Sequence, residues 1–325
     1  MRITPWMEQQ QFLYNMENIN TAMQNVQEEL STGKVLNLPQ DDPVAVSEDM
    51  DLSAEVSQVS ASLSTISTGL SWMNATQTAI QGIISQLQQI QSDIVAALNT
   101  PNQSQGGLAG YAATVSQLIQ GVYQIADQMV GNRYLFGGQA DNTAPTTYLK
   151  TSPTDTPQPI PPGAGPSSGS RSYDPFDDSQ ASPPNINYQI ADGVSVRVTV
   201  TAYDLFLVQP SSTAPNLQDT LNNIQTDIYS GNSGNLKQDL SDLQVNLNQV
   251  INLNAALGAR IQRMTAAQNQ LTQYQTNLTD LKGGIEGADM ARVLTQFSTD
   301  QVIYEAALQM GAQILLPSLV NYLPS

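Results

Sequence analysis

Apolar residues recur every seven positions near both ends of this 325-residue chain, and this repeat constrains the fold more than any other feature. A strict seven-residue period is typical of α-helices that pack along a stripe and wrap one another with a left-handed supercoil. The first segment carries two such rows, which are Phe12, Ile19 and Val26, and Met16, Met23 and Leu30. The N-terminal segment is therefore predicted to be an amphipathic helix that needs a helical partner.

Two longer rows lie further along the chain. The first contains Val59, Ile66, Met73, Ile80, Leu87 and Ile94, and the second contains Leu243, Val250, Leu257, Met264, Leu271, Leu278 and Ile285. These rows are best interpreted as the inner faces of packed core helices. A shorter helical pattern over about 110–130 is expected to fold back on the helix before it.

The last helical pattern is expected from about Ala288 to Leu316. The glycines of GGIEG at 283–287 separate it from the preceding row, because glycine disfavours a helix interior. Its apolar positions form one row of Met290, Phe297 and Tyr304 and a neighbouring row of Leu294, Leu308 and Leu315. It is predicted to be a second amphipathic helix in need of a partner.

The middle of the chain differs in kind. Ten of the 18 prolines lie between Pro145 and Pro184, which predicts loop rather than helix. The alternating segments 186–190 and 194–200, separated by Asp192–Gly193, then predict a β-hairpin. Helical periodicity resumes near Leu217.

These patterns predict a mainly α fold. Its N- and C-terminal segments would form a long antiparallel helical hairpin or bundle, with a small β-rich insert domain at the tip. Three domains are expected: a terminal coiled-coil polymerisation region (1–40 plus 286–325), a helical bundle (41–140 plus 235–285) and a β-rich, Pro/Gly-rich outer domain (141–234).

The segment LNLPQDDP interrupts the first two helical patterns. Its Asp pair resembles a carboxylate dyad or a cation site, but a helix start explains it better. Asp accepts hydrogen bonds from free backbone N–H groups, and proline suits the first helical position. The segment is therefore predicted to be an inter-domain turn, formed by Pro39, Asp41, Asp42 and Pro43.

Composition argues against several classes of function. A formal net charge of −17 with 11 Lys and Arg disfavours nucleic acid and anionic membrane surfaces as partners. The absence of Cys and His removes the commonest nucleophiles, general bases and metal ligands. We therefore expect no enzyme, no cofactor, no metal and no catalytic residue. The N-terminal sequence lacks the apolar core of a cleavable signal peptide, and no run of about 18 apolar residues is present.

Four motifs, in order, resemble the flagellin superfamily, and the Asp-Asp-Pro form is most similar to its hook–filament junction proteins, the hook-associated proteins of the third type. They are EELSTGKVLNLPQDDPVAVSEDMDL, NRYLFGGQADNTAP, YQIADGVSVRVTVTAYDLF and ADMARVLTQFSTDQVIYEAALQMGAQI. The resemblance implies a secreted structural subunit of the bacterial flagellum. It also implies type III export without a cleavable signal peptide, and a cytoplasmic chaperone on the C-terminal helix. The implied assembly partners are other copies, the first hook-associated protein and flagellin.

The resemblance and the apolar rows together predict that the terminal helices are mobile in the monomer and become ordered between copies. The predicted subunit-interface residues are Phe12, Met16, Ile19, Met23, Val26, Leu30, Met290, Leu294, Phe297, Tyr304, Leu308 and Ile314. Two alternatives remain open at this point: a filament-forming flagellin, and a secreted coiled-coil adhesin or effector.

Overall fold

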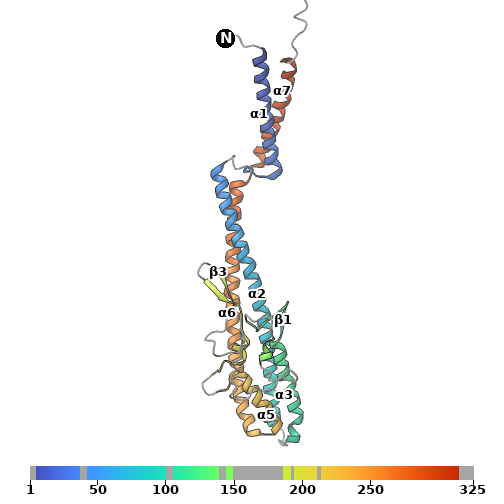
Figure 1. The fold of residues 1–325 in the computed structure, drawn as a ribbon, viewed down its shortest axis with the longest axis vertical. Helices are drawn as coiled ribbons and strands as arrows, with labels where there is room; N and C mark the ends of the chain where they lie inside the picture. Colours follow the sequence, from blue (N-terminus) through green and yellow to red (C-terminus); the bar gives the residue numbers. More distant parts are fainter. Residues whose placement is uncertain are drawn as a thin grey trace, which may run out of the picture. The chain divides into compact units, whose positions relative to one another are not determined.

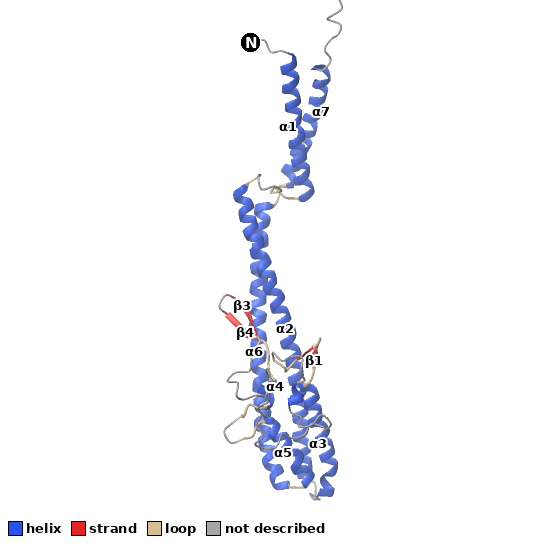
Figure 2. Cartoon of the chain, viewed as in Figure 1, coloured by secondary structure: helices blue, strands red, loops and turns tan. Residues whose placement is uncertain are grey.

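The computed structural model describes residues 5–36, 42–99, 105–138, 144–148, 186–191, 194–210 and 214–314. Most of these residues lie in helices, and the strands are short, which confirms the predicted mainly α fold class (Figures 1 and 2). The helices are α1 (Pro5–Thr32), α2 (Pro43–Leu98), α3 (Gln105–Ala126), α4 (Ala202–Phe206), α5 (Leu217–Ser230), α6 (Ser233–Glu286) and α7 (Met290–Ile314), with a 3-10 turn η1 at Pro145–Tyr148. The strands are β1 (Met129–Val130), β2 (Arg133–Tyr134), β3 (Asn187–Ala191) and β4 (Val194–Arg197).

The chain divides into two compact units. Unit 1 comprises Met1–Ser60 and Gln273–Ser325, and unit 2 comprises Ala61–Thr272. Because α2 and α6 each contribute to both units, the division falls inside these helices. The predicted division into three domains is finer than this and stays a prediction.

Unit 2 is a helical bundle of α2, α3, α5 and α6. The backbone of Gly69 in α2 lies close to the side chain of Met264, and that of Gly258 in α6 lies close to Gln77. These two contacts show that the helices run antiparallel. The helix α3 folds back on α2, as predicted, and Ser116 of α3 accepts a hydrogen bond from Gln225 of α5 at 3.3 Å. A short loop at 231–232 joins α5 to α6.

The seven-residue rows form the core of unit 2. On α2, the side chains of Ile66, Met73, Ile80, Leu87 and Ile94 are completely buried. On α6, Leu243, Val250, Leu257 and Met264 are buried against them in one continuous cluster. The prediction that these rows mark core helices is confirmed.

Two antiparallel hairpins complete unit 2. The predicted hairpin is present as β3–β4, with Tyr188 paired to Val196. The ring of Tyr188 approaches Gly69 so closely that an added Cβ would lie 2.7 Å from it, so the hairpin packs directly on α2. Its turn at 192–193 lies outside the described residues.

The second hairpin was not predicted. The helix expected to reach Val130 ends at Ala126, because Met129 and Val130 pair with Tyr134 and Arg133 to form β1–β2. Gly131 supplies the left-handed conformation (φ +64°) that this tight turn requires.

Candidate subunit interface

The helices α1 and α7 pack antiparallel along one side of each other within unit 1 (Figure 1). All six residues predicted on α1 face this seam. Val26 is buried, whereas Phe12, Met16, Ile19, Met23 and Leu30 are half-buried. A two-helix pair has no third element to cover such a stripe, so these side chains keep part of their surface in solvent.

The α7 side of the seam differs from the prediction. The residues that lie in it follow a 4-3-4-3-4 spacing: Val293, Phe297, Asp300, Tyr304, Ala307 and Gly311. Phe297 and Tyr304 were predicted from the apolar rows. The other four were missed because Asp, Ala and Gly break an apolar row, although their seven-residue spacing was readable.

Three of the four remaining predicted residues of α7 are exposed rather than packed in the seam. Met290, Leu294 and Leu308 are 41%, 52% and 49% exposed, respectively. The side chain of Ile314 lies outside the described part of the chain. These three residues therefore form an apolar row beside the seam that the described residues leave exposed.

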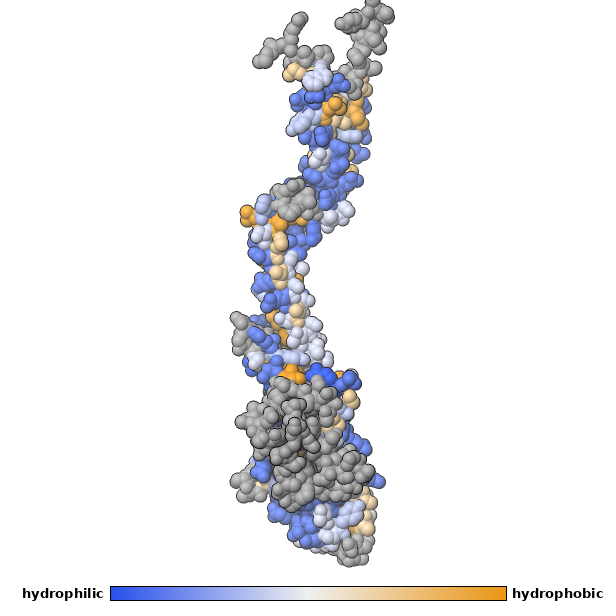
Figure 3. All heavy atoms as spheres, in the orientation of Figure 1, coloured by the Kyte–Doolittle hydropathy of each residue, from blue (hydrophilic) through white to orange (hydrophobic). Residues whose placement is uncertain are grey.

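Further large apolar side chains of the same pair are exposed, and apolar side chains are visible at the surface in Figure 3. They are Trp6, Met7, Leu13 and Tyr14 on α1 and Val302, Ile303 and Met310 on α7. Sequence reasoning missed them because they lie outside the dominant rows. The helix pair thus exposes large apolar side chains on both α1 and α7.

Near the start of α1 and the end of α7, the close approach of the two helices depends on one glycine. The ring of Phe12 lies over Gly311 of α7, where an added Cβ would fall 2.3 Å from the ring. The absence of a side chain at this position therefore lets the aromatic ring pack against the α7 backbone.

The end of α1 and the break between α6 and α7 are held together by backbone hydrogen bonds. Gly33 ends α1 in a left-handed conformation (φ +71°) and so redirects the chain. The Val35 N–H then donates to the Glu286 carbonyl at 2.8 Å, and the Ala288 N–H donates to the Gly33 carbonyl at 2.9 Å. We call this contact the break junction.

Charged side chains add to the break junction. Lys34 Nζ lies 2.8 Å from Glu286 Oε2, and this hydrogen bond raises the pKa of Lys34. Lys282 Nζ lies 3.8 Å from the same Glu286 oxygen and 4.0 Å from Asp49 Oδ1 of α2. These contacts stabilise the last turn of α6, which runs through Gly283 and Gly284 and ends at Glu286, within the GGIEG segment expected to separate the two helical patterns.

The predicted turn is only partly described. Asp42 Oδ1 accepts hydrogen bonds from the backbone N–H groups of Val44 and Ala45 at 3.0 and 3.1 Å, so it caps α2, which begins at Pro43 as expected. Pro39 and Asp41 lie outside the described residues. The role of the four residues as an inter-domain turn stays a prediction.

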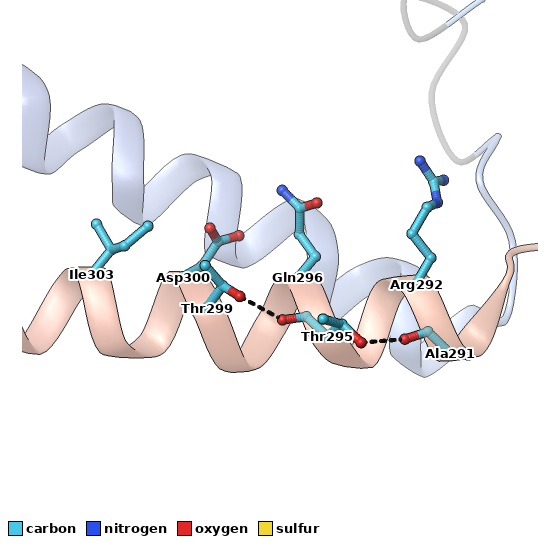
Figure 4. Close-up of a pocket in the computed structure, with 7 residues that line it drawn as sticks. All are labelled: Ala291, Arg292, Thr295, Gln296, Thr299, Asp300 and Ile303. Atoms are coloured by element: carbon cyan, nitrogen blue, oxygen red, sulfur yellow. Dashed lines mark hydrogen bonds between the residues drawn. The ribbon is translucent and has the colours of Figure 1, made fainter.

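A shallow groove follows one face of α7, and Figure 4 shows that α7 alone supplies its walls. It is lined by Ala291, Arg292, Thr295, Gln296, Thr299, Asp300 and Ile303. The threonine hydroxyls are occupied by bonds to the helix backbone, since Thr299 donates to the Thr295 carbonyl and Thr295 to that of Ala291, each at 2.8 Å. The groove presents an open, mixed polar surface rather than an enclosed reaction site.

Among the described residues, no cluster of acidic side chains has the arrangement of a metal site. None of the described helices is long and apolar enough to cross a bilayer. The surface chemistry of unit 1 is thus that of a helix pair with unpaired apolar flanks.

Comparison with known proteins places this architecture in a class. The N-terminal helical region of bacterial flagellin matches residues 3–141, and its C-terminal helical region matches residues 240–323. Both regions come from the same protein family, as its N-terminal and C-terminal parts, and together they cover more than half of the chain. The chain belongs to the flagellin superfamily, whose members are structural, non-enzymatic proteins of the bacterial flagellum.

Solved structures share the fold at low sequence identity. Bacillus cereus FlgL has a TM-score of 0.52 and 18% identity over 72% of this chain and 99% of its own. A Vibrio parahaemolyticus protein, provisionally assigned as a flagellar hook-associated protein, has a TM-score of 0.57 and 13% identity over 76% of this chain and 100% of its own. A search of curated proteins found no match.

Proposed function

We propose that this protein is a junction subunit of the bacterial flagellum, which joins the hook-associated zone to the flagellin filament and assembles through α1 and α7. The observation that carries the proposal is the helix pair itself. Its seam is half-buried, and the row of Met290, Leu294 and Leu308 is exposed in the part of the chain that the structure describes.

The energetics favour completion of this pair by neighbours. Each large apolar side chain contributes roughly 1.5–3 kcal/mol when it is fully buried. Ordering a residue costs about 1–2 kcal/mol of backbone entropy, so a lone pair of 28 and 25 residues with a half-buried seam is marginal. Additional burial between copies supplies the missing stabilisation, and an incompletely folded end stays threadable during export.

The junction role is supported by the Asp-Asp-Pro turn in the sequence and by the fold shared with FlgL and the Vibrio protein. It implies three partners besides further copies, namely the first hook-associated protein, flagellin and a cytoplasmic chaperone on the C-terminal helix. Export through the flagellar type III apparatus completes the proposal.

A gene-deletion strain tests the role. We expect intact hooks, flagellin shed into the medium as unpolymerised subunits, and loss of motility that the wild-type gene restores. Filaments of normal length on the deletion strain would contradict the proposal.

A filament-forming flagellin is the second candidate, because both matched family regions are those of flagellin. Electron microscopy of the purified protein separates the two roles. Long self-assembled filaments would identify a flagellin, whereas their absence together with the deletion phenotype supports a junction subunit.

A further inference from the structure

Two groups of like charges stand out in unit 2, although other charged residues, such as the exposed Lys237 of α6, also lie there. The helix α2 has no charged residue from Val56 to Ser92, and between Asp242 and Asp280 the only charges on α6 are Arg260 and Arg263. Together with Arg197 of β4, these two form what we call the arginine patch. The carboxylate patch consists of Asp227 at the end of α5 and Asp239 and Asp242 near the start of α6.

The arginine patch carries more positive charge than its one carboxylate neutralises. Asp204 Oδ2 accepts hydrogen bonds from Arg197 and, at 2.9 Å each, from the backbone N–H and the hydroxyl of Thr201. This oxygen is therefore fully occupied. Arg260 is half-buried, and both its burial and the positive charge of Arg197 lower its pKa.

Neither Arg260 nor Arg263 has a carboxylate within ion-pair distance among the residues that the structure describes. Arg263 is exposed and lies one helical turn from Arg260 on the same side of α6. Within the described part of the chain, the patch therefore presents two guanidinium groups that form no ion pair, with Asp204 as the carboxylate that acts on Arg260 electrostatically.

The carboxylate patch has the opposite imbalance. Asp239 is only 5% exposed, and its Oδ2 atom has no hydrogen-bond partner in the described structure. Burial first, and then the nearby Asp227 and Asp242, raise the pKa of Asp239 to about 7. Asp227 and Asp242 are half-buried and remain reachable from solvent.

Neutral amides donate hydrogen bonds to these two carboxylates, and a side-chain hydrogen bond also links Asp239 with Asp227. Asn235 donates to Asp227 at 3.4 Å, and Gln238 donates to Asp242 at 3.1 Å. Within the described residues, no Lys or Arg forms an ion pair with the patch, and no metal-site arrangement is present.

The two patches cannot neutralise each other in one molecule. Arg260 and the pair Asp239 and Asp242 lie on the same continuous helix, and at 1.5 Å per residue they are separated by about 27–32 Å. This exceeds the Debye length of about 8 Å at physiological ionic strength several-fold. Among the residues that the structure describes, neither patch is therefore neutralised by the other.

We propose that the arginine patch of one copy binds the carboxylate patch of a second copy of this chain, so that neighbouring copies contact each other head to tail through unit 2. The proposal rests on the multi-copy assembly proposed above. A second copy is the partner whose charges match both patches at once. Such a contact uses two different surfaces, and repetition of it generates a ring or a helical array. Arginine suits it, because a guanidinium binds carboxylates through paired, charge-assisted hydrogen bonds.

The chain contains no cysteine, so an introduced pair reports the contact without background. Gln238→Cys places a thiol beside the carboxylate patch, and Ala256→Cys places one a helical turn from Arg260; both positions are exposed. The double-cysteine protein is expressed in the deletion strain, and assembled flagella are treated with a short bismaleimide. We expect a ladder of covalent multimers, whereas each single-cysteine variant gives no ladder.

Charge reversal then tests the pairing in the same background. Arg260→Glu with Arg263→Glu, or Asp227→Lys with Asp242→Lys, is expected to reduce the ladder at least about tenfold. All four reversals together are expected to restore it, which a misfolded protein would not do. The exposed Asp280→Lys is the matched control and leaves the ladder unchanged.

The outcomes separate this contact from the proposed function. If the wild-type gene restores motility but the ladder is absent, survives either double reversal or stays lost in the fourfold variant, the head-to-tail contact is wrong and the junction role stands. If the deletion strain keeps normal filaments, the proposed function itself fails.

Discussion

The carboxyl group of Asp239 has a pKa well above that of an aspartate in water. The pKa of its carboxyl is raised to about 7, first by burial and then by Asp227 and Asp242. The same group in the unfolded chain releases its proton near pH 4. Between these values the folded state binds more protons, so this group lowers stability as the pH rises from about 4 to 7.

Asp239→Asn removes the buried charge and should therefore stabilise the isolated chain at alkaline pH. We expect the free energy of unfolding to rise by roughly 2 kcal/mol at pH 8 and to change little at pH 4.5. Denaturant titrations followed by circular dichroism at the two pH values measure both. Asp280→Asn, at an exposed site of the same helix, is the control, and equal effects of Asp239→Asn at both pH values would contradict the account.

Gly33 allows a second test at the residue scale. Its φ of +71° disfavours a side chain, although no atom lies within 4 Å of an added Cβ. We expect Gly33→Ala to cost about 1 kcal/mol, through backbone conformation alone. Amide hydrogen exchange of Val35 and Ala288 should become faster, because the break junction depends on this turn. Gly33→Asn should be milder, and unchanged exchange in Gly33→Ala would show that the junction forms independently of the turn.

Single residues also show which features of the structure could be predicted from the sequence. The cap at Asp42 followed from local chemistry, and the structure has it. The contact of Lys34 with Glu286 joins residues 252 positions apart, and no local pattern signals such a pair. Asp300 and Gly311 escaped notice for another reason: their places in the seam follow the seven-residue spacing, but their side chains are not apolar.

At the scale of elements, long rows were predictable and short elements were not. The row from Ile66 to Ile94 marks the buried face of α2, since so many core contacts repeat with one period. The hairpin β1–β2 has two residues in each strand, too few for an alternating pattern. The end of α6 at Glu286 lies within the GGIEG segment expected to separate it from α7, and the contacts of Glu286 stabilise this last turn despite its two glycines.

The exposed row of α7 should matter for assembly and not for folding. Leu294→Ser combined with Leu308→Ser removes two half-exposed side chains, so the free energy of unfolding should change by less than about 1 kcal/mol. Assembly should be lost, as judged by complementation of the deletion strain and by shed flagellin. Gln301→Ser, at an exposed polar site of α7, is the control. Full motility of the double variant would remove this row from the interface.

The non-helical segment between α1 and α2 should be equally necessary for assembly. Replacing residues 36–42 with alanines favours one continuous helix, which would take α1 away from the break junction. We expect a soluble, helical subunit that cannot restore motility to the deletion strain. Normal motility with this variant would show that the two helices need no separate axes.

At the scale of the whole molecule, the sequence predicted the fold class and the superfamily but not the two-unit division. The division falls inside α2 and α6, where neither glycine nor proline marks a boundary. Which apolar residues stay exposed was also beyond prediction, because it depends on how two helices are rotated against each other.

The central claim is that α1 and α7 are incomplete until neighbouring copies cover them. Amide hydrogen exchange of the isolated full-length chain tests it most directly. The account predicts rapid exchange along α1 and α7 beside strong protection of the α2 and α6 segments in unit 2. Protection of α1 and α7 equal to that of the Ile66–Ile94 core in the isolated chain would contradict it.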